Sequence, residues 1–224
     1  MPALSFVLPV LNEAAGLSER LEELRARYPN AELIVVDGGS SDDTLAAAAP
    51  HCDRLEHAPK GRASQMNAGA LVAGGDYLIF LHADTRPGLD EPGFGSALAA
   101  LPCWGFCRVR LSGDEWWARV ISFFINLRSR ATRVATGDQM LFLQRDLFHE
   151  SGGFDSIPLM EDVAYCKRLR RLASPLMIRE PVITSSRRWR ERGVLRTVLQ
   201  MWYLRLAYFI GVSPQRLHRI YYGG

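Results

Sequence analysis

Acidic residues follow apolar segments of this chain at three places, in a pattern that suits chemistry on a phosphorylated ligand. The acids are Asp37 after the run 33–36, Asp84 after the run 77–81, and Glu161 and Asp162 after the glycines at 152–153. The first two runs are apolar throughout, which predicts strands covered on both faces of a parallel sheet. The carboxyl ends of such strands border the ligand crevice of α/β folds. We therefore expect Asp37 and Asp84 to meet at one crevice and hold a nucleotide with its metal ion.

Alternating strands and helices have to position these residues. The expected strands cover residues 4–10, 32–36, 53–57, 76–81, 103–111, 139–144 and 176–183. The expected helices cover 14–27, a short segment through Ala49, 62–73, 87–102 and 160–173. This alternation predicts an α/β fold, with a mostly parallel sheet flanked by helices and right-handed crossovers. We expect one domain over residues 1–193 and a basic, amphipathic helical extension over 194–224.

Charge is distributed unevenly along the 224 residues. Residues 1–100 carry a net charge of −7 and residues 101–224 a net charge of +10. The basic part favours an anionic partner, such as substrate phosphates or anionic lipid. Nucleic acid is not expected, because no nucleic-acid module signature is present. The four cysteines form no CxxC pair and no secretory signal begins the chain, so we expect a reducing, cytoplasmic location.

Five short blocks in a fixed order give the chain a family resemblance. They are residues 7–13, 35–44, 61–69, 80–84, and 152–154 with 161–162. In this order and spacing they resemble the family 2 glycosyltransferases, which have the GT-A (Rossmann-like) fold, and within them the bacterial branch called selenodomain-associated transferase 2. The resemblance extends from residue 4 to about residue 193. It implies an inverting transfer of a sugar, of the hexosyl type, from a nucleotide-diphospho-sugar linked to UDP or GDP.

The resemblance also implies which residues contact the donor. By position they are Leu8, Pro9, Glu13, Asp37, Gly38, Lys60, Arg62, Asn67, Ala83, Asp138, Gln139 and Arg188. Many relatives carry a second Asp where this chain has Gly38, so one nucleoside contact differs here.

Several of these residues have a second interpretation that the sequence leaves open. Asp37 could accept from a base N–H or a ribose hydroxyl, or it could cap a turn. Arg62, beside a helix N-terminus, could hold a phosphate. Asn67 could instead be a buried structural hydrogen bonder. Lys60 and Arg188 could be solvated charges, and Asp138 and Gln139 ordinary polar loop residues.

The metal and the base are expected in two later blocks. His82 and Asp84 occupy the positions of the family's Asp-x-Asp, so Asp84 is the expected ligand of Mn²⁺ or Mg²⁺, and His82 either a second ligand or a hydrogen bonder to the nucleotide. An imidazole ligand would favour Mn²⁺. The family's base corresponds to Asp162, which would deprotonate the acceptor hydroxyl, with Glu161 as its neighbour.

Two aromatic-rich stretches, 116–128 and 194–212, indicate a surface for a partner. Neither is a clean apolar span of about 20 residues, so no transmembrane helix is expected. Aromatic helices flanked by Arg suit an interfacial position on the inner face of the cell membrane. In that case the acceptor could be a lipid or polyprenyl phosphate. A core helix or a homodimer contact is the alternative.

Two other functions compete with sugar transfer. A catalytically silent, membrane-associated nucleotide-sugar-binding protein would explain the departures at Gly38 and His82. A sugar-nucleotide pyrophosphorylase shares the fold, but it needs a Gly-rich loop with Arg and Lys directly after the first strand, where this chain has residues 9–13.

Overall fold

The N-terminal half of the molecule is a parallel sheet built from the most apolar segments of the chain. The computed structural model describes residues 1–223. Its first four strands are β1 (Leu4–Val10), β2 (Glu32–Asp37), β3 (Arg54–His57) and β4 (Tyr77–Phe80), and they lie side by side in the order β3-β2-β1-β4, all parallel. The connecting helices are α1 (Leu17–Arg27), α2 (Thr44–Ala48) and α3 (Arg62–Val72). The predicted parallel α/β alternation is thus confirmed for this half.

Alternate residues of these strands enter two separate cores. Phe6, Leu8 and Leu33 pack with α1 on one face of the sheet. Val7, Ile34 and Leu78 pack with α3 on the other. Burial on both faces explains why the strands read as continuous apolar runs.

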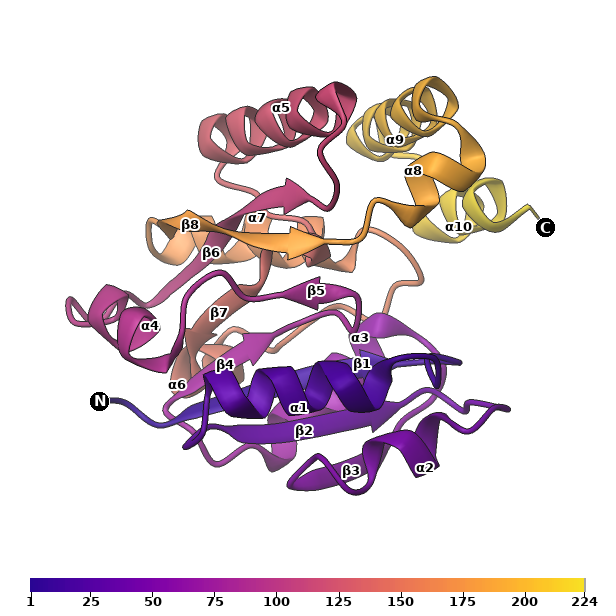
Figure 1. Cartoon of the computed structure of the whole chain (residues 1–224). Helices are drawn as coiled ribbons and strands as arrows, with labels where there is room; N and C mark the ends of the chain where they lie inside the picture. The colour runs from indigo at the N-terminus through magenta and orange to yellow at the C-terminus, as the bar shows by residue number, and fades with distance from the viewer. Residues whose placement is uncertain (224) are drawn as a thin grey trace.

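The C-terminal half continues the same sheet with mixed directions. Its strands are β5 (Thr85–Arg86), β6 (Trp104–Leu111), β7 (Leu141–Gln144) and β8 (Leu176–Thr184), and the full order is β3-β2-β1-β4-β7-β6-β8-β5. β7 runs antiparallel to both β4 and β6, while β8 is parallel to β6. The helices are α4 (Glu91–Ala97), α5 (Trp116–Thr132), the 3₁₀ turn η1 (Gly137–Gln139), α6 (Arg145–Glu150), α7 (Glu161–Leu172), α8 (Arg187–Arg192), α9 (Val194–Phe209) and α10 (Pro214–Tyr222). Figure 1 shows the sheet curling upward, with α5 and α9 at the end opposite β3.

Two sequence predictions are corrected here. The helix expected over 87–102 is restricted to α4, since Asp90 caps it by accepting from the Gly93 N–H and Leu101 leaves helical geometry with a φ of 49°. The strand expected over 139–144 begins only at Leu141, because Gly137–Gln139 forms the 3₁₀ turn. The two-residue strand β5 was not predicted from the sequence.

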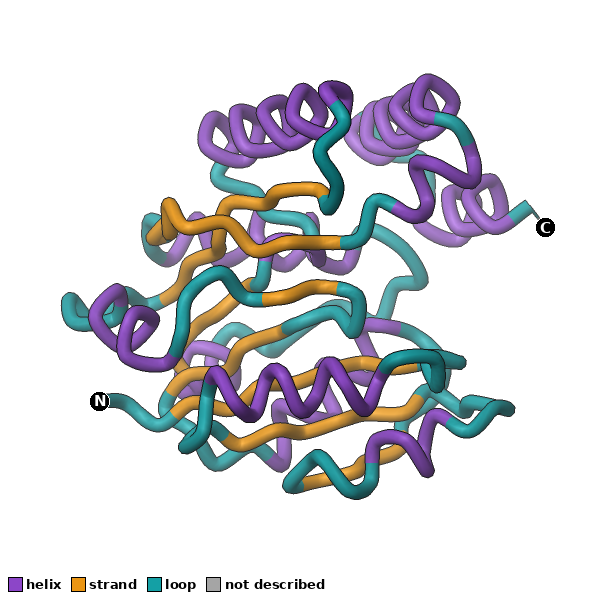
Figure 2. The backbone as a smooth tube through the Cα atoms, in the orientation of Figure 1, coloured by secondary structure: helices purple, strands orange, loops and turns teal. Residues whose placement is uncertain are grey.

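The chain ends in three helices that pack back on the domain. Leu204 and Ala207 of α9 cluster with Leu217 and Tyr221 of α10 and with the segment that precedes α7. Figure 2 shows these helices as a separate layer at the top right. Within residues 1–223, no helix has the length and apolar content needed to cross a membrane.

Candidate functional site

The carboxyl ends of β1 and β2 form the first wall of the site. Gln65 of α3 is buried beneath them and its side-chain amide donates to the carbonyls of Val10 (2.7 Å) and Val36 (2.8 Å). The Gly38 N–H also donates to the Val10 carbonyl, at 3.0 Å. A Cβ on Gly38 would lie 3.0 Å from the Gln65 side chain. Gly38 and Gln65 therefore set the spacing of the two strand ends together. Sequence reasoning missed Gln65, which stood within the block 61–69.

Asp37 is held in the turn that follows β2. Its carboxylate accepts from the N–H groups of Gly39 (2.8 Å) and Ser40 (3.0 Å) and from the Ser40 hydroxyl. Burial opposes ionisation, but these hydrogen bonds from Ser40 and Gly39 outweigh it and lower the pKa of Asp37. In this structure the Asp37 carboxylate caps the turn after β2 and fixes the backbone of that turn at the crevice.

The loop after β1 is tied to the same turn. Asn12 has a φ of 53° and its side-chain oxygen accepts from the Ser41 N–H at 2.9 Å. The Glu13 N–H donates to the Thr44 hydroxyl at 2.8 Å. Leu8 is buried at the strand end and Pro9 is half-buried. The loops after β1 and β2 are thus one connected rim, with the Glu13 carboxylate 3.8 Å from Arg20.

The end of β4 carries the Asp-x-Asp-like segment. Asp84 is exposed and Ala83 is buried. His82 is buried, and its Nδ1 lies 3.5 Å from the Asp138 carboxylate. Gly137 packs so closely on the imidazole that a Cβ there would lie 2.2 Å from it. His82 therefore joins β4 to η1, and Asp84 presents an exposed carboxylate at this edge, one oxygen of which accepts from the Thr85 hydroxyl at 3.3 Å.

Glu161 and Asp162 open helix α7 on the opposite wall. One Asp162 oxygen accepts from the Gly137 N–H at 2.7 Å and the other from the Val163 N–H at 2.6 Å. Each oxygen keeps a further lone pair for a substrate. Met160, which precedes the helix, has a φ of 69°, so an unfavourable left-handed residue fixes where α7 begins.

Glu161 is buried and Asp162 is half-buried beside it, and the charge of each carboxylate affects the other. Burial raises the pKa of Asp162, against its backbone hydrogen bonds and the positive charge of Arg62. Burial and the charge of Asp162 also raise the pKa of Glu161. Arg62 is solvent-accessible, yet the carboxylates of Glu161, Asp138 and Asp162 outweigh its desolvation and raise its pKa. A carboxyl with a raised pKa beside a cation is typical of a proton acceptor in a cleft.

A recess lies between the end of β4, η1 and the start of α7. Its lining includes His82, Gly137, Glu161 and Asp162 together with apolar side chains such as Phe80 and Phe154. His82 and the predicted base Asp162 thus lie at one recess, although 80 residues separate them in the sequence, whereas Asp84 is not part of its lining.

Two predicted contacts have packing roles in the structure. Asn67 clamps Phe154, since its side chain donates to the Phe154 carbonyl and accepts from the Phe154 N–H, both at 2.9 Å. Gln139 is fully buried, and its oxygen accepts from Ser129 of α5 at 2.7 Å. Both amides have protein partners in this structure, and their contacts with a donor stay predictions.

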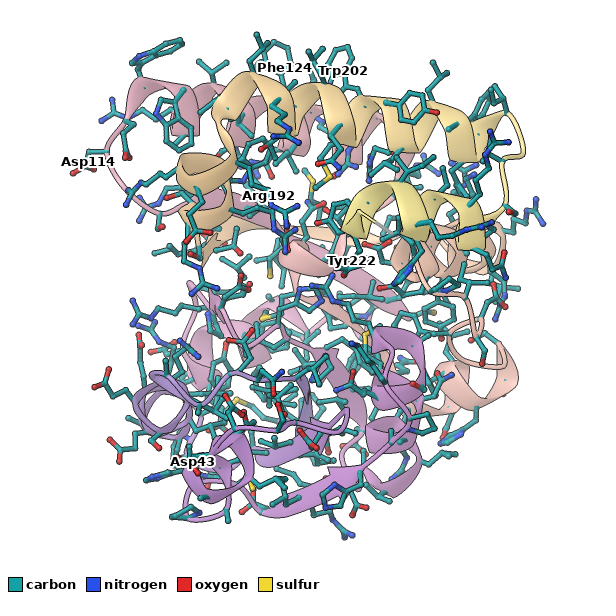
Figure 3. All side chains as sticks on the ribbon, turned by 90° about the vertical axis from the view of Figure 1, so that its right-hand side faces the viewer. Asp43, Asp114, Phe124, Arg192, Trp202 and Tyr222 are labelled. Atoms are coloured by element: carbon teal, nitrogen blue, oxygen red, sulfur yellow. The ribbon has the colours of Figure 1, made fainter. Side chains whose placement is uncertain are left out.

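The C-terminal helix α10 contributes Tyr221, a residue that the sequence had not indicated. The Arg188 guanidinium donates to the Tyr221 hydroxyl of α10. Burial opposes ionisation of Asp138, but its contact with His82 and the charges of Arg62 and Arg188 lower its pKa. Figure 3 shows Tyr222 at the boundary between the C-terminal helices and the N-terminal half. Arg188 and Arg62 thus form a cationic side of the site, while Lys60 is exposed before α3.

The residues at this edge fit a divalent cation that arrives with a diphosphate. The described residues contain no group of three or more Asp, Glu, His or Cys that could enclose an ion by themselves. Mg²⁺ and ions like it are commonly bound by one or two carboxylates plus substrate phosphates, with water completing the shell. Asp84 supplies one such carboxylate, whereas His82 is turned to Asp138.

The curled α/β sheet flanked by helices matches the GT-A fold of solved structures. The family model for glycosyl transferase family 2 matches residues 5–90. A relative from Mycobacterium tuberculosis named as an uncharacterized glycosyltransferase is 31% identical over 193 residues, with 80% of this chain and 72% of that protein covered. The chain therefore belongs to the family 2 glycosyltransferases.

Solved structures share the fold at low sequence identity. A mannosyltransferase from Pyrobaculum calidifontis, in complex with GDP-mannose and Mn²⁺, has a TM-score of 0.57 and 22% identity, covering 82% of this chain and 56% of that one. Glucosyl-3-phosphoglycerate synthase from Mycobacterium tuberculosis, in complex with Mn²⁺, UDP and glucosyl-3-phosphoglycerate, has a TM-score of 0.58 and 19% identity, covering 80% of this chain and 70% of that one. The chain thus spans little more than half of the mannosyltransferase.

Proposed function

We propose that this protein transfers a hexosyl group from a UDP- or GDP-linked sugar to an acceptor hydroxyl or lipid phosphate, with inversion at the anomeric carbon. The observation that carries the proposal is the placement of Asp162. Its carboxylate lines a recess, is oriented by the Gly137 and Val163 N–H groups, and has a raised pKa. The neighbours that hold GDP-mannose or UDP with Mn²⁺ support a nucleotide-sugar donor and a divalent cation. The five sequence blocks support membership of the selenodomain-associated transferase 2 branch.

In a single displacement, Asp162 takes the proton of the acceptor hydroxyl as that oxygen attacks the anomeric carbon. The new carbon–oxygen bond forms while the bond to the diphosphate breaks, and the nucleoside diphosphate leaves with the electron pair. Arg62 and Arg188 stand where they can stabilise the charge of the leaving diphosphate. A cation held by Asp84 would supply further neutralisation of that charge. The raised pKa brings the basicity of Asp162 closer to neutral pH.

Donor recognition is assigned to the rim formed by the loops after β1 and β2. The connected rim of Asn12, Glu13 and the turn at Asp37 suits a nucleoside, because its backbone is fixed before the ligand arrives. Pre-ordering reduces the entropy lost on binding. Gly38 keeps the backbone open at the position where many relatives carry Asp.

The test separates binding from transfer. Calorimetry would measure binding of UDP and GDP, each with Mn²⁺, with Mg²⁺ and with EDTA, to the wild type, Asp84→Ala and Asp162→Asn. We expect metal-dependent binding of one nucleotide, lost in Asp84→Ala and retained in Asp162→Asn, while hydrolysis or transfer of the donor sugar falls about 10²–10⁴-fold in Asp162→Asn.

The matched control is Asp146→Asn. Asp146 is exposed on α6, which follows β7 at the opposite edge of the sheet, where Gln144 pairs with Tyr77. Turnover that is unchanged in Asp162→Asn would contradict the assignment of the base.

A silent nucleotide-sugar-binding protein is the second candidate. The observation in its favour is that His82 stands where the family has an acid and contacts Asp138, which leaves the exposed carboxylate of Asp84 at the predicted metal position. Nucleotide binding without any donor turnover in the wild type would favour this candidate.

A further inference from the structure

Exposed apolar side chains are concentrated on two helices. Among residues 1–223, twelve of the eighteen exposed large hydrophobic residues lie on α5, on α9, or directly after α9. They are Trp116, Val120, Phe123, Phe124, Leu127, Leu195, Leu199, Trp202, Tyr203, Leu206, Phe209 and Ile210. Single exposed apolar residues are normal, but a collection on one surface marks an interaction site. We call this surface the α5–α9 face.

Helix α5 is oriented with its polar side inward. Its buried positions include Ser122 and Asn126, which hydrogen bond to β6: the Asn126 amide accepts from the Val109 N–H at 2.9 Å and donates to the Val109 carbonyl at 2.8 Å. The Ser122 hydroxyl accepts from the Leu111 N–H at 3.0 Å. A helix on the surface of a globular protein usually turns its apolar side to the core and its polar side to water, whereas α5 does the opposite. The hydrogen bonds to β6 fix the helix with its aromatic side outward.

Helix α9 carries a continuous outer stripe of the same kind. Its exposed apolar residues recur at positions 195, 199, 202, 206 and 209, the alternating spacing of four and three that aligns side chains on one side of a helix. Leu204 and Ala207 face inward instead, onto α10. In the described part of the chain, the outer stripe therefore makes no core contact and is exposed on the surface.

The two stripes face the same way. Figure 1 places α5 and α9 in one layer at the top of the molecule. In Figure 3, turned by 90°, Phe124 of α5 and Trp202 of α9 both project from the top, while Asp43 lies at the far end. The views agree that both helices present their aromatic residues at one end of the protein.

Charge distinguishes between the possible occupants of this face. The two helices contain five Arg residues and no Asp or Glu, and Arg119, Arg130 and Arg196 are exposed. A second copy docked face to face would bring two such arginine sets together, which is unfavourable. Anionic lipid headgroups would neutralise them. Residues 1–100, with a net charge of −7, form the end of the molecule that points away from this face.

We propose that the α5–α9 face docks the protein on an anionic lipid bilayer. The aromatic and leucine side chains enter the interfacial region, and the exposed Arg residues contact lipid phosphates. The inner side of α9 packs with α10 and with Met160, directly before Glu161 and Asp162. Docking would therefore hold the start of α7 close to molecules carried by the membrane. Binding to lipid does not depend on the proposed sugar transfer and is measured without nucleotide.

The experiment is flotation of the full chain with vesicles, at micromolar protein. One vesicle preparation contains equal phosphatidylglycerol and phosphatidylcholine, and the other phosphatidylcholine alone. We expect binding to the anionic vesicles that is at least tenfold stronger and that weakens with salt. The double variant Phe124→Ser/Trp202→Ser, at sites 56% and 69% exposed, should lose at least tenfold in binding.

The matched control is Leu71→Ser/Leu172→Ser. These leucines are 71% and 59% exposed but lie on α3 and at the end of α7, outside the face. This variant should bind within twofold of the wild type. Brominated phosphatidylcholine, included in anionic vesicles, should quench the wild-type tryptophan fluorescence through Trp116 and Trp202, a readout that needs no variant to fold.

Three outcomes would overturn the proposal. The first is no binding to the anionic vesicles, and the second is equal losses in the face and control variants. The third is a dimer, detected by light scattering, that Phe124→Ser/Trp202→Ser dissociates while vesicle binding is absent. That result would assign the face to a second copy of the chain.

Discussion

Gln65→Leu tests whether one buried amide maintains the nucleoside edge of the site. The side chain is 3% exposed, and its NH₂ group makes two hydrogen bonds to main-chain carbonyls at 2.7 and 2.8 Å. Leucine has a similar size and helix propensity but no donor. The substitution therefore removes two hydrogen bonds with little change in packed volume.

The magnitude follows from those two bonds. A neutral intramolecular hydrogen bond contributes about 1 kcal/mol net, and a buried carbonyl left without a partner costs about 1–3 kcal/mol. Val10 keeps the hydrogen bond from the Gly38 N–H, so its carbonyl is not left without a partner. We expect a loss of about 2 kcal/mol in the free energy of unfolding, which is a fall in Tm of about 4–8 °C for a chain of this size.

Denaturant unfolding followed by circular dichroism measures this loss, and nucleotide calorimetry on the same samples measures its effect on the rim. The ends of β1 and β2 should separate slightly, so the nucleotide Kd should rise several-fold. Gln144→Leu is the control, because the Gln144 amide is half-buried and reaches its partners only at 3.3 and 3.4 Å. A Gln65→Leu variant no less stable than Gln144→Leu would refute this reasoning.

Three further predictions concern other parts of the site. Gly69→Ala should cost about 1–3 kcal/mol in chemical denaturation, because its Cβ would lie 2.5 Å from Val7, whereas Gly74→Ala, with no atom closer than 3.7 Å, should not. Asp162→Asn should raise the Tm near pH 7, and this gain should shrink toward pH 4. The pKa of Asp162 is higher in the folded state than its unfolded value, which is near 4. The wild-type folded state therefore loses stability as the pH rises from the unfolded pKa through the folded pKa, and Asn removes that loss. A gain that instead grows toward pH 4 would contradict this sign. Tyr221→Phe, which frees Arg188, should raise the donor KM several-fold with little change in kcat, and an unchanged KM would show that the contact does not orient Arg188.

Local patterns predicted most of the scaffold because they depend on neighbouring residues. The strand at 4–10 was predicted with its observed bounds and β2 within one residue, since mostly apolar runs have few alternatives in a buried sheet. The bounds of β8 were also predicted within one residue. The helix over 87–102 was overextended because the Asp90 cap starts the helix late and Leu101, with a φ of 49°, is not helical. The strand β5 has only two residues and leaves no periodic signal.

The order of strands, by contrast, required the structure. β7 inserts antiparallel between β4 and β6, so residues far apart in the chain share one recess. Alternation of strands and helices predicts parallel neighbours, but it does not say which strand a later segment will join. The site residues on η1 and α7 depend on that insertion.

The sequence by itself determined the family, the parallel N-terminal sheet and the acidic residues at its edge, because short-range periodicity and motif spacing are enough to predict each of them. Only the tertiary structure decided what those residues contact. Gln65 bridges two strand ends, His82 turns to Asp138, Asp162 is held by the Gly137 N–H, and Tyr221 meets Arg188. Each of these contacts joins residues that are 25 or more positions apart in the sequence. They depend on three-dimensional packing, which one-dimensional spacing does not encode.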